Sequence, residues 1–303
     1  MSLRINTNIS AANAYRNLSI NDKSVASSLE KLSSGLRINR AADDAAGLSI
    51  SEGLKSQIGG LTVAARNAQD GVNVAQTADG ALNETSSILQ RMRDLAVQAA
   101  NTGTQDADAR NAANTEFQQL GTEIDRIAGS TKFGTQSLLN GQYTGAFQVD
   151  SASVATNTAA QINLDLSSTA ITTATTPTTG TGTAITGLDS TGLGLTGLGT
   201  TSPSVDLTTG ANATAAIDLL DNAIKGVSTV RATVGATQNR FEYTINNINV
   251  AIENLSASKS TITDTDMASE MVKFSKNQIL QQAATSMLAQ ANVQGQGVLK
   301  LLG

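Results

Sequence analysis

The sequence predicts a mainly α-helical protein, in which long coiled-coil helices from both termini pair as a hairpin-like rod that carries a small β-hairpin region. Apolar residues near both ends recur at alternating three- and four-residue steps, which is the spacing of a coiled-coil seam. The chain of 303 residues is 40% hydrophobic but only 3% aromatic. Its apolar side chains are therefore mostly small and aliphatic, which suits helix seams better than a thick globular core.

The N-terminal half predicts three helices. The seam of the first consists of Leu18, Val25, Leu29, Leu32 and Leu36. A second apolar run extends from Leu54 to Ala96 and predicts one long helix, with the polar residues Asp79, Ser86 and Arg93 at seam steps. The inward residues of the shorter third helix are Ala113, Phe117, Leu120, Ile124 and Ile127.

The middle of the chain changes character twice. Short strands are expected around Phe133 and over Ala146–Val149, with a turn at Asn140-Gly141, because Asn-Gly readily adopts positive φ. From about residue 151 to 204 the composition shifts to Thr, Gly, Ala and Ser with almost no charge. We expect this variable region to be a low-complexity surface segment.

Helical periodicity returns in the C-terminal third. A regular seam extends from Ile217 to Leu255, interrupted by two polar residues, Arg231 and Gln238. These two could specify the register within the chain, or Arg231 could pair with an acid such as Glu84 or Asp94 of another subunit. After capping residues at 261–266, a last helix carries the seam residues Leu280, Met287, Val298 and Leu301.

The composition excludes several classes of function. Histidine, cysteine and tryptophan are absent, so the chain has no Ser-His-Asp triad, no thiolate nucleophile and few ligands for zinc. A net charge of −5 without any basic cluster argues against nucleic-acid binding. No apolar stretch approaches the length of a membrane span, and the first residues lack the apolar core of a signal peptide. We expect no catalysis, no cofactor, no metal and no membrane insertion.

Two candidate sites have simpler interpretations. The pairs Asp43/Asp44, Asp106/Asp108 and Asp264/Asp266 could bind a metal, but each lies near an expected helix start or bend, where acidic side chains cap backbone N–H groups. Residues 192–197 match the phosphate-binding pattern G-x-G-x-x-G. Both of its flanks are rich in Thr and Gly, instead of the strand and helix that this chemistry needs, so a flexible loop is the better interpretation.

Several stretches closely resemble bacterial flagellin. In the N-terminal half these are Leu3–Asn8, Leu29–Asn39 and Ala42–Leu48. Near the other end they are Ile262–Ala268, Gln290–Asn292 and Val298–Leu302. Two matching ends in the right order around a divergent middle make the resemblance specific.

The resemblance implies an extracellular, self-assembling subunit of the flagellar filament, exported without a cleaved signal peptide. Residues 1–44 and 257–303 would form an inner coiled-coil tube, in which the two terminal seams lie. Residues 45–150 and 205–256 would form an outer helical domain, and 151–204 the variable surface. The family's partners would be further copies of the chain, an export chaperone, the filament cap and hook-junction proteins. The alternatives are a hook-filament junction protein and a secreted coiled-coil adhesin.

The resemblance also implies recognition by hosts. The stretch Gln90–Gln98 is similar to the flagellin segment that is sensed by a Toll-like receptor of animals, and Gln90, Arg91, Leu95 and Glu116 fall at contact positions. Residues 30–51 resemble the peptide sensed by a plant receptor kinase. The primary role of all these residues would be assembly.

Overall fold

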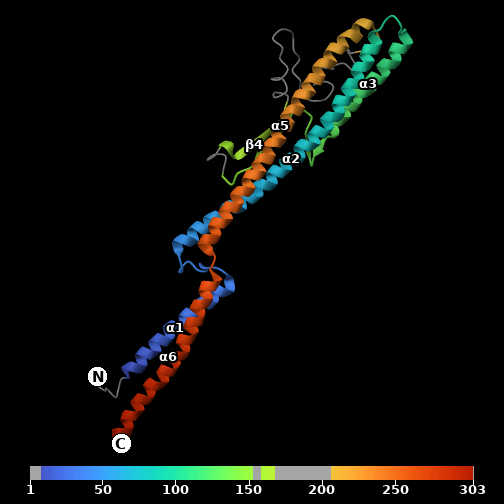
Figure 1. Cartoon of the computed structure of the whole chain (residues 1–303). Helices are drawn as coiled ribbons and strands as arrows, with labels where there is room; N and C mark the ends of the chain where they lie inside the picture. The colour runs from blue at the N-terminus through green and yellow to red at the C-terminus, as the bar shows by residue number, and fades with distance from the viewer. Residues whose placement is uncertain (1–7, 153–157, 168–205, 303) are drawn as a thin grey trace. The chain divides into compact units, whose positions relative to one another are not determined.

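The computed structural model describes residues 8–152, 158–167 and 206–302, of which 158 and 294–302 are described by their backbone alone. Five α-helices and two small antiparallel hairpins lie in these ranges (Figure 1), which confirms the predicted mainly α class. The chain divides into two compact units. Unit 1 contains residues 1–58 and 253–303, and unit 2 contains residues 59–252.

Unit 1 is built on two helices from opposite ends of the chain. Helix α1 (Ile9–Ser34) lies beside α6 (Met267–Leu302) in Figure 1. The unit also takes the first turns of α2 (Ala45–Ala100) and the last turns of α5 (Gly210–Thr263). The boundaries of unit 1 therefore fall inside α2 and α5, while the domain boundaries expected at 44/45 and 256/257 remain predictions for the filament.

Polar side chains fix the pairing of α1 with α6. The Asn8 side-chain amide donates to the Ala291 carbonyl at 2.9 Å, and the Gln281 amide donates to Asp22 Oδ1 at 2.7 Å. Since early residues of α1 face late residues of α6, the two helices are antiparallel.

The α1 side of this contact is shifted from the predicted seam. Leu18, Val25 and Leu32 are half-buried, as predicted, but Leu29 and Leu36 are exposed. Small or polar residues between them are turned toward α6, among them Ala14, Asn21 and Ser28. The prediction failed because it followed the large apolar residues, whereas this contact is made largely by small and polar ones.

The α6 side differs in the same way. Leu280 is 41% exposed and Met287 is 66% exposed, so neither packs against α1. The half-buried side chains are those of Phe274, Asn277, Gln281, Ala284 and Leu288. The side chains of Val298 and Leu301 lie outside the described part of the chain. A role for Leu280 and Met287 in contacts between subunits stays a prediction.

Unit 2 packs α2, α3 (Ala107–Ser130) and α5 around one apolar core. Their largest buried side chains include Leu82, Leu89 and Met92 of α2, Phe117 and Ile124 of α3, and Leu220 and Val227 of α5. These positions confirm the predicted inward faces of all three helices.

Two ion pairs connect α2 to α5, and Arg231 takes part in one of them. Its guanidinium donates to Asp79 Oδ1 at 3.0 Å, and Arg93 donates to Asp221 Oδ1 at 2.6 Å. Both pairs lie within one chain, as expected if Arg231 specifies the register between α2 and α5. Pairing of Arg231 with Glu84 or Asp94 of another subunit stays a prediction.

Two hairpins complete unit 2, where one was predicted. Strand β1 (Lys132–Phe133) pairs with β2 (Gln136–Ser137), and β3 (Thr144–Gln148) pairs with β4 (Gln161–Asp165), which follows the 3₁₀ turn η1 (Thr158–Ala160). The expected turn at Asn140-Gly141 connects β2 to β3 instead of closing a hairpin.

Strand β4 corrects the expected start of the variable region. Ala160, Ile162, Leu164 and Leu166 are buried, although they lie beyond residue 150. Their alternation with polar residues is short and was hidden by the Thr- and Ala-rich composition around it. The remaining variable residues 168–204, including the glycine motif at 192–197, lie outside the described residues.

The acidic pairs cap helices, which confirms the capping interpretation. Asp44 accepts from the Gly47 N–H, Asp106 accepts from the Ala109 N–H, and Asp266 accepts from the N–H groups of Ala268 and Ser269.

Within the described ranges, no helix is both long and apolar enough to cross a bilayer.

Candidate assembly surface

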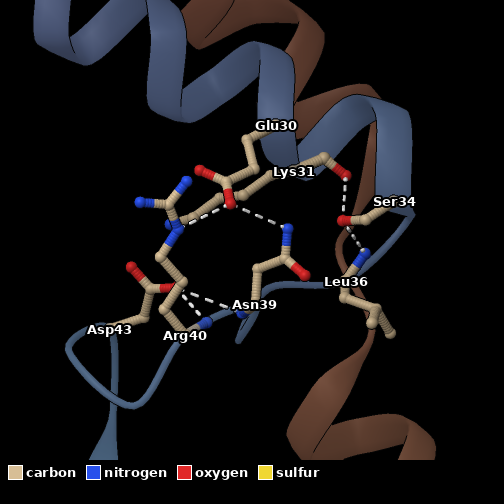
Figure 2. A network of polar contacts seen from close by, with 7 residues as sticks. All are labelled: Glu30, Lys31, Ser34, Leu36, Asn39, Arg40 and Asp43. Atoms are coloured by element: carbon tan, nitrogen blue, oxygen red, sulfur yellow. Dashed lines mark hydrogen bonds and ion pairs between the residues drawn. The ribbon is translucent and has the colours of Figure 1, made fainter.

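A rigid polar turn joins α1 to α2 within unit 1, over residues 35–44 (Figure 2). Gly35 ends α1 with φ 72°, a left-handed conformation that favours glycine. The Arg40 guanidinium donates to Glu30 Oε1 at 2.8 Å, and the Asn39 amide donates to the same oxygen at 3.1 Å. One carboxylate thereby ties the turn back to the last turns of α1.

The Asp43 carboxylate closes the same turn by accepting hydrogen bonds from its backbone. Its Oδ2 accepts the backbone N–H groups of Arg40 and Asn39 at 2.9 and 3.1 Å (Figure 2). These two hydrogen bonds hold the pKa of Asp43 below its ordinary value, because they favour the charged carboxylate. The turn is thus set by local hydrogen bonds together with the buried side chain of Ile38, which is 4% exposed.

The turn is fastened to the junction between α5 and α6. Arg37 donates from Nε and Nη2 to the Ile262 carbonyl at 3.1 and 2.6 Å. Its backbone N–H donates to the Thr263 carbonyl, and the Thr265 N–H donates to the Gly35 carbonyl. The stretches around residues 35 and 263, which carry the family resemblance, therefore form one joint. The sequence predicted neither this joint nor the role of Arg37, because no spacing rule relates two segments more than 200 residues apart.

Glu270 is a buried acid between α1 and α6. The residue is 7% exposed, and its carboxylate accepts from Ser28 Oγ at 2.7 Å and pairs with Lys273 Nζ at 3.1 Å. The hydrogen bond from Ser28 is the main reason that the pKa of Glu270 lies below its ordinary value, with Lys273 and Lys31 adding to it. A polar residue in such a seam specifies register at some cost in stability.

Large apolar side chains point away from the α1–α6 contact into solvent. On α1 these exposed residues are Ile9, Tyr15, Ile20 and Leu29. On α6 they are Met267, Met271, Val272, Ile279, Leu280, Met287 and Val293, with exposed fractions between 41% and 69%. We call this α6 set the outer face of α6.

The outer face of α6 is broad. Successive residues of a helix turn by about 100°, so Met271, Ile279 and Met287 point in clearly different directions. Together with the half-buried residues toward α1, apolar side chains occupy nearly every side of the helix. Polar residues such as Lys276 and Gln282 lie among them, but the monomer leaves all seven large apolar side chains of the outer face exposed. The arrangement fits a subunit whose terminal helices are covered by neighbouring chains.

The predicted receptor residues lie in unit 2, and the structure brings Arg91 and Glu116 into contact. Arg91 Nε and Nη2 lie 2.8 and 2.7 Å from Glu116 Oε1, so this ion pair joins α2 to α3 at the surface beside the exposed Gln90. Leu95 is 3% exposed and belongs to the core. The expectation of Leu95 as a surface contact is therefore wrong for the monomer, because Leu95 lies on the face of α2 that packs in the core shared with α3 and α5.

Sequence comparison identifies both ends of the chain. Residues 5–144 match the bacterial flagellin N-terminal helical region, and residues 217–302 match the bacterial flagellin C-terminal helical region. The two matched regions include α1, α2, α3, β1 and β2, and nearly all of α5 and α6. They therefore contain both the joint around Arg37 and the outer face of α6.

Similar proteins agree with these matches. The chain is 47% identical to a flagellin of Halalkalibacterium halodurans, over 98% of this chain and 99% of the relative, and 44% identical to a flagellin of Bacillus subtilis, over 99% and 100%. A structure of a putative flagellar hook-associated protein from Vibrio parahaemolyticus shares the fold, with a TM-score of 0.56 over 73% of this chain and 100% of that one, at 13% identity. At such a low identity, this likeness shows a shared fold and nothing more. The identity of 47% and 44% over nearly the full length instead relates the chain to the flagellins. The chain belongs to the bacterial flagellin family, the structural proteins of the flagellar filament.

Proposed function

We propose that this chain polymerises into the extracellular flagellar filament through the outer face of α6 and the exposed apolar residues of α1. The observation that carries the proposal is that α6 exposes large apolar side chains in several directions, while α1 covers only one side of the helix. Burying these side chains between subunits would recover roughly 25 cal/mol for each Å² of apolar surface removed from water. Residues 1–44 and 257–303 would then form the inner tube, and residues 45–150 and 205–256 the outer helical domain.

The proposed role is structural and not catalytic. The acidic pairs that could have served a reaction cap helices or close turns, as described above for Asp43, Asp44, Asp106 and Asp266. The ion pairs Arg231–Asp79 and Arg93–Asp221 hold two helices in register. These charged groups thus have structural partners within the chain.

A single charge on the outer face of α6 tests the assembly surface. Val272 is 69% exposed in the monomer, so Val272→Asp should leave the monomer folded. In the filament the aspartate would lose its water, and pairing with Lys276 one turn away would offset only a small part of this cost. The critical concentration for polymerisation should therefore rise at least about tenfold. The matched control is Val272→Leu, which keeps an apolar side chain at the same position and should polymerise normally.

Sedimentation of polymer and circular dichroism of the monomer give the two readouts. Normal polymerisation of Val272→Asp would contradict an inner position for this face. Irregular bundles or monomers from the unaltered chain, instead of filaments of uniform width, would favour the adhesin alternative.

We further propose that host receptors of flagellin and the export chaperone, cap and hook-junction proteins bind this chain as they do in the family. The exposed Arg91–Glu116 pair and Gln90 support an animal receptor site on α2 and α3. Arg91 offers a planar donor fork that can bind carboxylates or carbonyls in pairs. Exposed residues of the turn in Figure 2, such as Arg40 and Asn39, lie in the stretch that resembles the plant receptor's ligand.

Arg91→Ala should weaken activation of the animal receptor by monomers at least about tenfold, because a few anchors dominate most protein interfaces. The control is Arg126→Ala, which breaks an equally exposed Arg–Glu pair on α3. Receptor signalling in reporter cells measures both. Equal potency of the two variants would contradict the proposed site. Leu95→Ala does not serve as a test, because it opens a cavity in the core.

A further inference from the structure

We propose that Met267, Met271 and Met287 form an oxidation site, at which peroxide converts the free subunit into a form that cannot assemble. The inference rests on the proposed function, since it places these three side chains in contacts between subunits. It adds a chemical modification and a control of assembly that the assembly surface alone does not imply.

The three thioethers are the accessible oxidisable groups of the described chain. Met267, Met271 and Met287 are 47%, 52% and 66% exposed, whereas Met92 is fully buried in the core of unit 2. The sequence contains no cysteine, histidine or tryptophan. Of the five methionines, only Met1 lies outside the described residues. A mild two-electron oxidant should therefore act first on α6.

The reaction needs only hydrogen peroxide. The thioether sulfur attacks one peroxide oxygen, the O–O bond breaks, and a sulfur–oxygen bond forms. The sulfur is oxidised by two electrons. The second peroxide oxygen leaves as hydroxide, takes the proton from the oxygen that is now bound to sulfur, and becomes water. Each methionine becomes a sulfoxide, which is polar and chiral where the thioether was flexible and apolar.

The position of the three residues separates assembly from folding. The side chains that α6 turns toward α1 include Phe274, Ala284 and Leu288, and none of the three methionines is among them. Sulfoxides on the outer face therefore leave the α1–α6 contact of the monomer intact. In a filament each sulfoxide would have to lose water without a matched hydrogen-bond donor, which disfavours burial. Filaments that already cover these side chains should resist the oxidant.

The experiment oxidises purified full-length monomers with hydrogen peroxide, removes the oxidant, and measures assembly by sedimentation. Peptide mass mapping should find one added oxygen on each of the three methionines and none on Met92. The critical concentration for assembly should rise at least about tenfold, while the far-UV circular dichroism spectrum stays unchanged. Treatment with methionine sulfoxide reductases should restore assembly.

Two variants serve as matched controls. The triple variant Met267→Leu, Met271→Leu and Met287→Leu lacks the oxidisable thioethers, so its critical concentration, whatever its starting value, should be the same before and after peroxide. The variant Met92→Leu should remain as sensitive as the unaltered chain. A triple variant that loses assembly on oxidation would overturn the proposal, since the damage would then lie elsewhere, for example at Met1.

The outcomes also separate this proposal from the proposed function. If the unaltered chain assembles, and full conversion to sulfoxide at the three positions leaves its critical concentration unchanged, the oxidation site is wrong while the filament role stands. If Val272→Asp assembles normally, the assembly surface itself is wrong. If the triple variant fails to assemble at all, the test is whether methionine sulfoxide reductases restore assembly of the oxidised unaltered chain. A chain that does not regain assembly would contradict the proposal.

Discussion

At the scale of single residues, the fit between Gly71 of α2 and Phe241 of α5 sets how closely the helices of unit 2 approach. A Cβ atom at Gly71 would lie 2.5 Å from Phe241 Cζ, which is far inside normal contact. The Phe241 ring is fully buried and meets Phe147 of β3 edge-on, with ring centroids 5.3 Å apart. It therefore has little freedom to move aside.

Gly71→Ala should destabilise unit 2 relative to Gly80→Ala, a control in the same helix at a position where a Cβ meets nothing within 4 Å. Both substitutions gain the same helix propensity, so their difference isolates the overpacking. We expect the unfolding free energy of Gly71→Ala to lie about 1–3 kcal/mol below that of Gly80→Ala. Urea denaturation measures both, and equal values would show that Phe241 yields freely.

Some buried positions could be predicted from the sequence, and others could not. The inward positions of α3 and α5 could be predicted because large apolar residues fill them, as at Phe117 and Val227. Leu29 and Leu95 could not be placed, since a leucine on a helix gives no sign of whether its own chain or another one covers it. In the monomer Leu29 is exposed and Leu95 is buried.

At the scale of elements, α1 and α6 differ from the helices of unit 2 in what holds them together. The unit 2 helices share a continuous apolar core. Between α1 and α6, half-buried apolar residues such as Leu18 alternate with small residues and with polar contacts such as Ser28 to Glu270. The presence of α2, α3 and α5 could be predicted from periodicity, although α2 and α5 extend beyond the predicted runs Leu54–Ala96 and Ile217–Leu255. The pairing of β3 with β4 could not, because Ile162 and Leu164 lie in a stretch whose composition is typical of a loop.

The contact of α1 with α6 should weaken in acid. The pKa of Glu270 is lower in the folded chain than in the unfolded one, so its contribution to stability is present above the ordinary glutamate pKa of about 4.3. This contribution is lost as the pH falls through the lowered folded value. Protonation neutralises the carboxylate that faces Lys273 and Lys31.

Amide hydrogen exchange of α1 and α6, compared between pH 6 and pH 3 after correction for intrinsic rates, measures this effect. Protection should fall in the unaltered chain. Glu270→Gln should start with lower protection at pH 6 and lose less of it. Identical pH profiles for the two proteins would mean that other carboxylates of unit 1, such as Asp43 and Asp264, control the contact.

At the scale of the whole molecule, the chain has two parts. Unit 2 folds around its own core, whereas unit 1 has an apolar surface that needs other subunits to cover it. Unit 2 buries many large side chains in its own core, including Phe117, Phe241 and Met92. Unit 1 leaves seven large apolar residues of α6 exposed. The family and the class of fold could be inferred from the sequence, because the matching stretches lie at both ends. The way in which Arg37 and Thr265 join those ends depends on long-range hydrogen bonds, and no local pattern encodes them.

The most direct test of the central claim is a helical reconstruction of filaments polymerised from this chain, at a resolution that shows side chains. The account predicts α1 and α6 at the inside of the wall, with Val272, Ile279 and Met287 in contact with neighbouring subunits. Filaments in which the outer face of α6 stays exposed to solvent, while unit 2 makes the contacts between subunits, would contradict it.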